Sequence, residues 1–462
     1  MLALSVPGHR MRQRPGVILV GFGLASLKAR GGLASGRAHD TSSCRGAKAS
    51  SRTRLIIRLI WSGSTHRILF IHTVLKPAMS HDENNHSHVM LPPPSLKAQK
   101  GRGAVSNLQG RFEVNAREAY DDGWAREEEE QTPWKTQVTE EVCKSILSRN
   151  ASPDLPFGVS LNPYRGCEHG CIYCFARPTH SYLGLSPGMD FESKIIAKVN
   201  APDMLRRELA KAGYEPQAIA LGVNTDAYQP CERDRKLTRR VLEVLQECHH
   251  PVGLITKSSL IERDIDILAP MAAQRLAGVA ITLTTLDPAI ARTLEPRAAA
   301  PSRRLRTIRT LTDAGIPVAV SVAPIIPFVT EPEIERLLAA VKDAGAVSAH
   351  YTVLRLPWEV APLFHQWLET HFPDRAQRVM NRVRDMRGGK DYDSTFGARM
   401  KGEGVWADLI RQRFQIATER LGLTGKGSRF HTMDTSQFTR PLVVPPLGAR
   451  ARLVSSGQLD LF

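Results

Sequence analysis

The sequence lacks an apolar run that could cross a membrane. Its apolar stretch from Leu55 to Leu75 is broken by Arg58, His66 and Arg67, and a spanning helix needs about 20 predominantly apolar residues. The chain is also poor in cysteine, with seven in 462 residues. Few, widely spaced cysteines in a large chain argue against a disulfide framework and are typical of a reducing compartment. We therefore expect a cytoplasmic protein with no membrane segment.

Acidic residues are nearly absent from residues 1–78, which hold 13 Lys and Arg and one acidic residue, Asp40. The rest of the chain holds the other 49 basic and 45 acidic side chains, so most of the formal charge of +16 comes from this leader. The overall charge is thus weak evidence for a polyanionic partner. Two interpretations of the leader stay open. It is either a disordered or non-native extension before a start at Met79, or an organellar transit peptide, whose Arg- and Ser-rich composition it shares.

The residue composition and the hydrophobic pattern change near Pro156, and this change divides the remaining chain into two parts. Residues 79–155 combine a proline run, a basic stretch and four consecutive glutamates, so we expect them to be poorly ordered. From residue 156 on, short β-branched runs alternate with helical patterns. The runs begin near Gly158, Ala218, Val252, Ala277, Val318 and His350. Six strands separated by helices predict a parallel α/β sheet. Six repeats rather than eight predict a partial, open (β/α)6 barrel over residues 156–357.

The pattern after the barrel becomes mainly helical over residues 358–423, with a glycine-rich interruption at 387–404. We interpret this part as a small C-terminal domain that caps the mouth of the barrel. Residues 424–462 are punctuated by Gly, Ser and Pro, and we expect a flexible tail.

Cys167, Cys171 and Cys174 follow the first predicted strand with the spacing C-x3-C-x2-C. About one unrelated chain of this composition in 1,000 would contain that spacing by chance. Gly166 and Gly170 suit a loop that needs positive φ beside the thiolates. The loop also lies at the carboxyl end of a strand, where α/β folds carry their chemistry. The pattern predicts a metal site.

The residues alone leave three kinds of site open. One is a zinc ion with His169 or His180 as the fourth ligand, although zinc sites usually contain a second cysteine pair, which this sequence lacks. Another is an electron-transfer iron-sulfur cluster. The third is a cluster with one iron that has no protein ligand, because such cubes normally take four thiolates.

The cysteine spacing resembles the signature of the radical S-adenosylmethionine (radical SAM) superfamily. In that family three thiolates hold a [4Fe-4S] cluster, and S-adenosyl-L-methionine binds the open iron through its amino and carboxylate groups. The resemblance implies reductive cleavage of this cofactor to methionine and a 5'-deoxyadenosyl radical, which abstracts hydrogen from a substrate. It also implies a flavodoxin- or ferredoxin-like electron donor, and it places Tyr173 near the adenine.

Two further runs resemble the branch of this superfamily that contains spore photoproduct lyase. One is Thr225-Asp-Ala-Tyr-Gln-Pro-Cys-Glu232, directly after the second predicted strand, and the other is Glu295-Pro-Arg297. The resemblance covers about residues 156–357. It implies that Asn224, Thr225 and Asp226 accept hydrogen bonds from an ammonium group and that Arg297 binds a carboxylate.

Polar residues at the ends of the next strands are implied in the same way as contacts of the cofactor. They are Lys257, Thr282 and Thr284. The alternative for this whole set is that its members cap helices, form turns and satisfy backbone groups.

One position departs from the lyase pattern. In that enzyme a cysteine that returns a hydrogen atom precedes the Thr-Asp pair, and this sequence has Val223 there. The same hydrogen relay is therefore in doubt, and no catalytic residue is assigned. We expect Cys231, further along the loop, to be a buried small apolar residue.

The last five residues resemble the bacterial sliding-clamp-binding peptide. They are Gln458, Leu459, Asp460, Leu461 and Phe462. The two terminal apolar side chains could fill a groove while the glutamine amide forms a directional hydrogen bond. This resemblance moves the expected substrate toward damaged DNA in a bacterial cell. Two alternatives stay open: the end of the chain packs on its own domain, or the protein is an iron-sulfur or zinc binding module associated with nucleic acid and without SAM chemistry.

Overall fold

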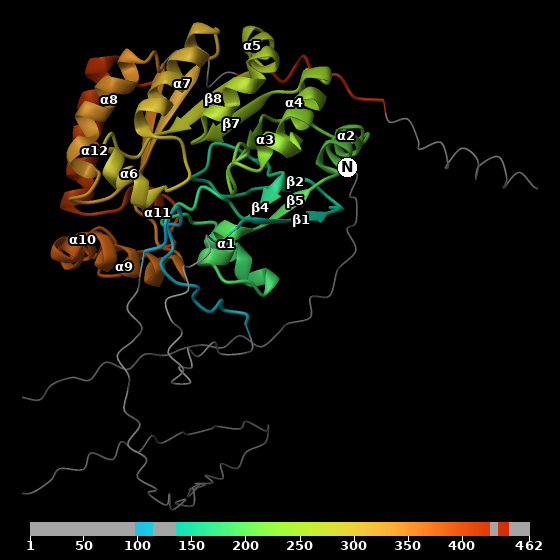
Figure 1. Cartoon of the computed structure of the whole chain (residues 1–462). Coiled ribbons are helices and arrows are strands. Elements are labelled where there is room, and N and C mark those ends of the chain that lie inside the picture. The colour runs from blue at the N-terminus through green and yellow to red at the C-terminus, as the bar shows by residue number, and fades with distance from the viewer. Residues whose placement is uncertain (1–97, 114–134, 426–432, 443–462) are drawn as a thin grey trace, which may run out of the picture. The chain divides into compact units, whose positions relative to one another are not determined.

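The computed structural model describes residues 98–113, 135–425 and 433–442 (Figure 1). The chain separates into two compact units between Ser87 and His88, and every described residue belongs to the second unit. The predictions for the leader and for the clamp-like peptide lie outside the described residues. Within them, no helix is both long and apolar enough to cross a membrane.

The six predicted strands form one parallel sheet, as expected. They are β3 (Val159–Leu161), β6 (Ile219–Leu221), β7 (Val252–Thr256), β8 (Ala277–Thr282), β9 (Val318–Ile325) and β10 (Ser348–Val353). Their order in the sheet is β10-β9-β8-β7-β6-β3. Because β10 and β3 are not paired with each other in the described chain, the sheet is an open barrel.

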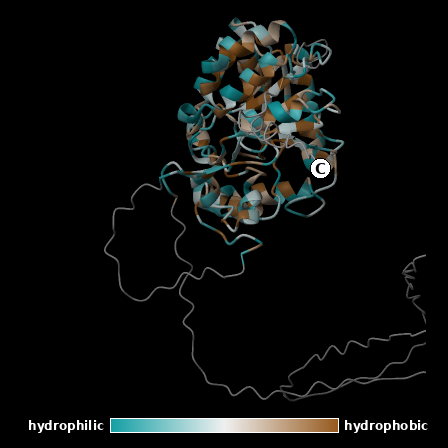
Figure 2. Cartoon of the chain, turned by 90° about the vertical axis from the view of Figure 1, so that its right-hand side faces the viewer, coloured by the Kyte–Doolittle hydropathy of each residue, from teal (hydrophilic) through white to brown (hydrophobic). Residues whose placement is uncertain are grey.

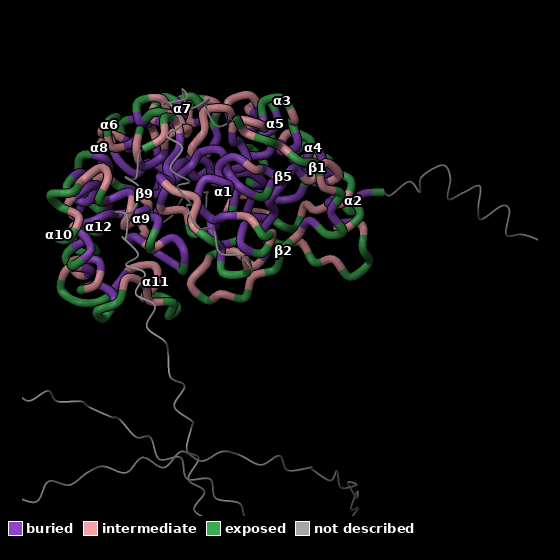
Figure 3. The backbone as a smooth tube through the Cα atoms, turned by 60° about the horizontal axis from the view of Figure 1, so that its bottom comes forward, coloured by how far each residue is buried: buried purple, intermediate pink, exposed green. Residues whose placement is uncertain are grey.

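Helices cover the outer face of this sheet (Figure 1). They are α2 (Ala201–Leu209), α3 (Glu232–Arg235), α4 (Leu237–Glu247), α5 (Ile265–Ala273), α6 (Pro288–Leu294), α7 (Pro301–Asp313) and α8 (Ile334–Asp343). In α4 the apolar side chains recur at helical spacing, and Val241, Leu242 and Leu245 are buried in one cluster with the barrel strands because this face packs on the sheet. Figures 2 and 3 show the result, with hydrophobic, buried strands inside and polar, exposed helix faces outside.

Residues 98–113 and 135–155, part of the region 79–155 that we expect to be poorly ordered, are placed in the structure, which corrects the expectation for them, and the rest of that region lies outside the described residues. β2 (Leu147–Arg149) adds an antiparallel seventh strand beside β3. β1 (Gln137–Glu141) pairs with β5 (Lys194–Lys198) in a second sheet, which β4 (Tyr164–Arg165) completes. Residues 98–113 are also placed against the barrel. The sequence signal was weak because β1 and β2 are short and largely polar, so they show no alternating apolar face.

The region after the barrel is helical, as predicted, but it belongs to the same compact unit. It contains α9 (Val360–His371), α10 (Pro373–Asp385), α11 (Ala398–Lys401) and α12 (Val405–Leu421). α12 packs on α8 and β10. Helices α9 and α10 share an apolar cluster with residues that follow β9 and β10 and with Ile172 of the cysteine loop. They therefore lie on the carboxyl-end side of the barrel.

The glycine-rich segment around α11 bridges the open side of the barrel. Lys401 Nζ donates to the carbonyl of Tyr351 on β10, at 2.7 Å. Arg399 Nε donates to Asp154 Oδ2 in the loop between β2 and β3, also at 2.7 Å, and Gly397 N donates to the same oxygen. The segment thus ties one edge of the sheet to the other.

Part of the predicted flexible tail is also ordered against the barrel. Residues 433–442 cross the amino ends of the strands, where Asp434 N donates to the carbonyl of Arg275 and Thr439 N to that of Cys248. The ring of Phe438 packs on Tyr214 and His250, with centroids 5.5 and 5.4 Å away. Gly, Ser and Pro marked this stretch as irregular, but its few apolar side chains are enough to dock it.

Candidate active site at the cysteine loop

The three cysteines lie in the loop between β4 and the 3-10 helix η1 (Arg177–Leu183), on the carboxyl-end side of the barrel. Cys167 and Cys171 are buried, Cys174 is partly exposed, and all three are free thiols. Gly166 and Gly170 have φ of 75° and 66°, so the expectation of positive φ beside the thiols is confirmed. A Cβ at Gly170 would lie 2.7 Å from a carboxylate oxygen of Glu192.

Ionisation of Cys167 and of Cys171 is unfavourable in the protein alone. Burial raises the pKa of Cys167, and the negative charges of Asp226, Cys171 and Cys174 raise it further. Burial likewise raises the pKa of Cys171 to about 12, although the ammonium of Lys257 opposes the shift. Three thiols grouped in this way become thiolates together only when positive charge is bound among them. This chemistry fits an iron cluster.

A buried ion pair holds the cysteine loop from one side. Arg177 donates to the carbonyls of Cys171, at 2.9 Å, and Gly170, at 3.0 Å, and pairs with Glu192. Glu192 also accepts from the backbone N–H groups of Gly103 and Ala104. The side chains of Arg177 and Glu192 are fully buried, so the pair fixes the loop backbone and fastens the segment 98–113 to it.

The run after β6 holds the loop from the other side. Gln229 Oε1 accepts from Glu168 N at 2.9 Å, and Gln229 Nε2 donates to the carbonyl of Gly166 at 3.3 Å. Glu168 Oε2 in turn accepts from Cys231 N. Cys231 is partly buried, and burial is the main cause that raises the pKa of its thiol. Gln229 and Glu168 thus connect the backbone of the cysteine loop to the run after β6.

The remaining members of this run brace strands and helices. Thr225 Oγ1 donates to the carbonyl of Tyr164 at 3.0 Å. Glu232 accepts from the Tyr164 hydroxyl, from Thr238 N and from Arg263. The run from Thr225 to Glu232 therefore connects β4, which precedes the cysteine loop, to the helices that follow β6 and β7.

Asp226 connects β6, β7 and the cysteine loop. Its carboxylate accepts from Thr256 Oγ1 at 2.6 Å, Lys257 N at 2.8 Å and Tyr228 N at 2.9 Å. His169 Nδ1 lies 3.2 Å from its Oδ2, close enough for an ion pair but off the line of a hydrogen bond. Burial alone would raise the pKa of Asp226, but His169 and these donors lower it. Its predicted contact with an ammonium group stays a prediction.

Tyr173 is joined to the E-P-R run by a second buried network. Its hydroxyl donates to Glu295 and lies 3.3 Å from Thr284 Oγ1. Thr284 donates to Glu295 Oε1 at 2.7 Å, and Arg304 pairs with the other carboxylate oxygen. Burial would raise the pKa of Glu295, but Arg304 and Lys257 lower it. Glu295 thus stays ionised and orients the tyrosine that precedes Cys174.

The family of the chain is decided by comparison with known proteins. The model of the radical SAM superfamily matches residues 161–341, which include the three cysteines, Asp226 and Glu295. An uncharacterised protein of Mycobacterium tuberculosis is 36% identical over 243 residues, which cover 52% of this chain and 71% of that protein. The chain belongs to the radical SAM superfamily.

More distant similarities were also found. An uncharacterised protein of Methanocaldococcus jannaschii is 25% identical over 223 residues, which cover 48% of this chain and 80% of that protein. Solved structures of spore photoproduct lyase, one of them with bound AdoMet and a dinucleoside spore photoproduct, match with a TM-score of 0.45 and 13% identity. This match covers 62% of the chain and 79% of the lyase.

Radical SAM proteins use a [4Fe-4S] cluster and S-adenosyl-L-methionine, and the donor set here fits the cluster. No three His, Cys, Asp or Glu side chains in the described residues converge closely enough to share one metal ion. A cluster does not require that convergence, because each thiolate binds its own iron. The two histidines considered as a fourth zinc ligand contact other groups. His180 Nε2 lies 3.0 Å from the carbonyl of Lys194, and His169 Nδ1 lies beside the carboxylate of Asp226.

Two of the predicted cofactor residues keep side-chain groups without a protein partner. Lys257 Nζ and Thr282 Oγ1 form no hydrogen bond or ion pair within the described chain. Lys257 Nζ lies 5.9 Å from the centre of the Tyr173 ring. Burial lowers its pKa, but Cys171, Glu295 and Asp226 raise it more, so it carries positive charge beside the cysteine loop. The side chain of Asn224 is exposed, while its backbone N–H donates to Asn162.

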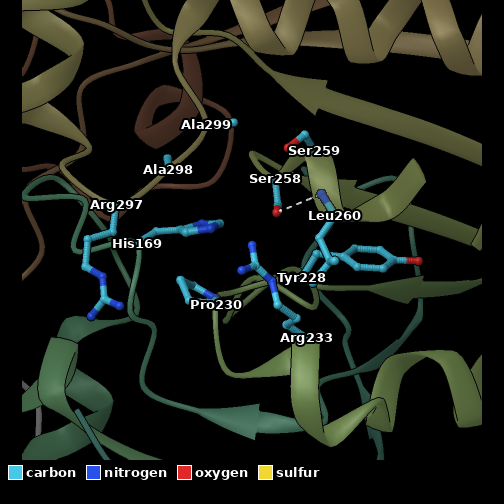
Figure 4. A pocket seen from close by; sticks show the side chains of 10 residues that line it. All are labelled: His169, Tyr228, Pro230, Arg233, Ser258, Ser259, Leu260, Arg297, Ala298 and Ala299. Atoms are coloured by element: carbon cyan, nitrogen blue, oxygen red, sulfur yellow. Dashed lines mark hydrogen bonds between the residues drawn. The ribbon is translucent and has the colours of Figure 1, made fainter. Parts of the chain in front are cut away.

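Arg297 lies at the edge of a cavity of about 330 Å³ beside the cysteine loop (Figure 4). Its guanidinium is 3.2 Å from Glu168 Oε1 and donates to Thr136 Oγ1 at 3.0 Å. Figure 4 shows His169 and Arg233 pointing into the cavity from opposite walls, while Arg297 turns away. The structure thus places Arg297 against the cysteine loop, and its predicted carboxylate contact stays a prediction.

Sequence reasoning missed several residues that position the loop. Glu168 and Gln229 lie inside the motifs that carried the resemblance, so their contacts could have been sought there. Arg177 and Glu192 gave no local signal, because a buried Arg-Glu pair is visible only when the chain is folded. Glu295 is part of the E-P-R run, but its contacts with Tyr173 and Arg304 form only when the chain is folded.

Proposed function

We propose that the protein is a radical SAM enzyme that reductively cleaves S-adenosyl-L-methionine and abstracts hydrogen from damaged DNA in the bacterial cytoplasm. The observation that carries the enzyme proposal is the buried group of three thiols, held between the Arg177–Glu192 pair and the run after β6. When bound, the cluster supplies one electron that cleaves the sulfonium and yields a 5'-deoxyadenosyl radical.

The protein's own residues would position and shield the reaction. Glu295 fixes the Tyr173 ring, which provides a flat apolar surface beside Cys174 for an adenine. Lys257 supplies a positive charge near Cys171, and the Thr282 hydroxyl supplies a hydrogen bond. Apolar side chains of α9 and α10 pack against Ile172 of the loop, which limits the access of water.

The DNA part of the proposal rests on two resemblances in the sequence. One is the run from Thr225 to Glu232, which is similar to that of spore photoproduct lyase, and the other is the clamp-like peptide from Gln458 to Phe462. Val223 replaces the cysteine of the lyase relay, so we propose a related repair reaction with a different hydrogen donor. The clamp-like peptide lies outside the described residues, which end at Leu442.

Hydrogen transfer tests the DNA substrate directly. Uniformly deuterated, ultraviolet-irradiated DNA is incubated with the reduced, cluster-loaded protein and unlabelled S-adenosyl-L-methionine. Deuterium should appear in the 5'-deoxyadenosine, because the radical takes its hydrogen from the substrate. Deuterated DNA that has not been irradiated is the control. Unlabelled 5'-deoxyadenosine from both DNA samples would leave the cleavage intact and remove DNA as the substrate.

The proposed clamp partner has its own test. A labelled peptide of residues 455–462 should bind a purified bacterial clamp with a dissociation constant of about 1 μM, or about −8 kcal/mol. Replacing Leu461 and Phe462 with alanine should abolish binding, since these side chains would fill the groove. Equal binding by the two peptides, or no binding by the first, would contradict this partner.

A further inference from the structure

Exposed aromatic side chains gather on the same side of the barrel as the cysteines. Tyr182 lies in η1, just after Cys174, and its exposed fraction is 69%. Trp358 follows β10 and is 62% exposed, and Phe112 of the N-terminal segment is 52% exposed. Large aromatic rings are costly to leave in water, so a cluster of them marks a binding surface.

These three rings come from distant parts of the chain but form one group around Glu359. The Phe112 and Tyr182 rings lie 4.9 Å apart. The Arg111 guanidinium lies 4.1 Å above the Trp358 ring and 5.4 Å from that of Phe112. Glu359 Oε1 accepts from Arg111 Nε at 2.8 Å, and Ser181 Oγ donates to the same oxygen at 3.4 Å. We call Phe112, Tyr182 and Trp358 the aromatic platform.

The backbone of Trp358 indicates that its exposed position is held against a conformational cost. Its φ is 48°, in the left-handed region that a bulky residue rarely adopts. Strain of this kind persists only where the surroundings impose it, and it is concentrated at functional sites. Here the Arg111 guanidinium stacks on the Trp358 ring and is itself held by Glu359, so these contacts keep the Trp358 ring exposed.

Positive charge without an acidic partner lies in the same loop as Trp358, between β10 and α9. Arg355, three residues before Trp358, forms no ion pair within the described residues, and its guanidinium donates to Met400 Sδ at 3.4 Å. Its guanidinium lies 5.2 Å from the ring of Phe175, which directly follows Cys174 and is 43% exposed. Flat rings together with a guanidinium group that has no acidic partner are the combination that binds nucleobases by stacking and phosphates by charge.

We propose that the aromatic platform binds unpaired nucleobases of a single-stranded or locally opened nucleic acid, with Arg355 at a backbone phosphate. This inference rests on the proposed DNA substrate and specifies how it is presented. A base inside a duplex has no free face for stacking, so a target must be unstacked before it reaches the cysteine side of the barrel. The platform stacks on bases next to that target.

Binding of a labelled single-stranded oligothymidine to the full, cluster-loaded chain tests the proposal. Fluorescence anisotropy is measured at about 0.3 M salt, which screens the attraction of the basic leader. Single-stranded DNA should bind more tightly than a duplex of the same length. The pair of changes Tyr182→Leu and Trp358→Leu should weaken binding of the single strand by about tenfold or more, because stacking is lost while apolar area is kept.

A matched control removes an aromatic ring from the opposite end of the barrel. Phe438→Leu should leave the affinity unchanged, since Phe438 packs on Tyr214 near the amino ends of the strands. The visible absorbance of the cluster in each variant reports whether the protein is still folded. A poly-glutamate peptide is the competitor that represents an acidic protein segment.

Equal affinity of the platform variant and the Phe438→Leu control would overturn the proposal. Displacement of the single strand by poly-glutamate at equal charge concentration would also overturn it, by showing a site for acidic peptides. If the protein cleaves S-adenosyl-L-methionine but binds no single strand, this inference alone fails. If a cluster-loaded protein binds the strand but does not cleave the cofactor, the proposed function fails instead.

Discussion

At the scale of single residues, Cys167 and Cys171 need a positive charge that their own surroundings do not supply. The ammonium of Lys257 opposes the shift at Cys171, but burial still raises the pKa values of Cys167 and Cys171. Replacing Cys167, Cys171 or Cys174 with alanine should therefore abolish the visible absorbance of the reconstituted cluster. Cys143→Ala and Cys248→Ala should keep it, because these buried cysteines lie in the apolar core. A cluster retained by Cys171→Ala would contradict the assignment.

Glu295 gives a second prediction at this scale, about stability. Its carboxylate is buried and pairs with the buried Arg304, so Glu295→Gln leaves an uncompensated charge. We expect the free energy of unfolding to fall by about 3 to 5 kcal/mol, measured by urea denaturation.

The control for Glu295 is a pair at the surface. Glu247, which pairs with Arg206, is 53% exposed, so Glu247→Gln should cost no more than about 1 kcal/mol. Losses of the same size in both variants would mean that the Glu295 network does not hold the site together.

At the scale of elements, the docked segment 433–442 covers a histidine whose protonation should affect stability. Burial lowers the pKa of His250 to about 4, compared with about 6.5 in an unfolded chain. Its Nδ1 lies 3.0 Å from the carbonyl of Pro251, and its Nε2 lies 2.8 Å from the Tyr214 hydroxyl. The neutral ring satisfies both contacts, with Nδ1 as donor and Nε2 as acceptor.

The sign of the pH dependence follows from these two pKa values. Between pH 6.5 and pH 4 the unfolded chain binds a proton that the folded chain does not, so stability falls as the pH falls. The loss attributable to His250 should reach about 3 kcal/mol at pH 4 and vanish above pH 7. Urea denaturation at several pH values should show a shallower decline in His250→Gln. An unchanged slope in that variant would refute the assignment.

The docked segment itself can be removed by truncation. A chain that ends at Leu442 should keep the stability of the full chain, because the described contacts of the tail lie before that residue. A chain that ends at Gly425 loses the Phe438 packing and the Thr439 and Asp434 bonds, and we expect a loss of about 2 kcal/mol or more. Equal stability of the two truncated chains would show that residues 433–442 do not contribute.

The barrel strands could be predicted from the sequence because apolar runs such as Val252–Thr256 are buried in a parallel sheet and need no partner to be recognised. The cysteines were found through their spacing. By contrast, the largely polar β1 pairs with β5, which lies far along the chain, and Arg111 meets the Trp358 ring only after folding. Such contacts depend on long-range packing, which local periodicity does not encode.

At the scale of the whole molecule, the carboxyl ends and the amino ends of the barrel strands carry different groups of residues. The carboxyl ends of the strands carry the cysteine loop, Lys257, the Tyr173–Glu295 network and the aromatic platform. The amino ends carry the docked segment 433–442, after which the clamp-like peptide follows in the sequence.

If the three thiols hold a cluster that cleaves S-adenosyl-L-methionine, the reduced protein must produce 5'-deoxyadenosine. The full chain is reconstituted anaerobically with iron and sulfide, reduced with dithionite and mixed with the cofactor, and 5'-deoxyadenosine is quantified by chromatography. We predict that the product forms with the intact chain and not with Cys171→Ala. A protein that contains a full cluster but yields no 5'-deoxyadenosine would contradict the account and favour an electron carrier or a binding module.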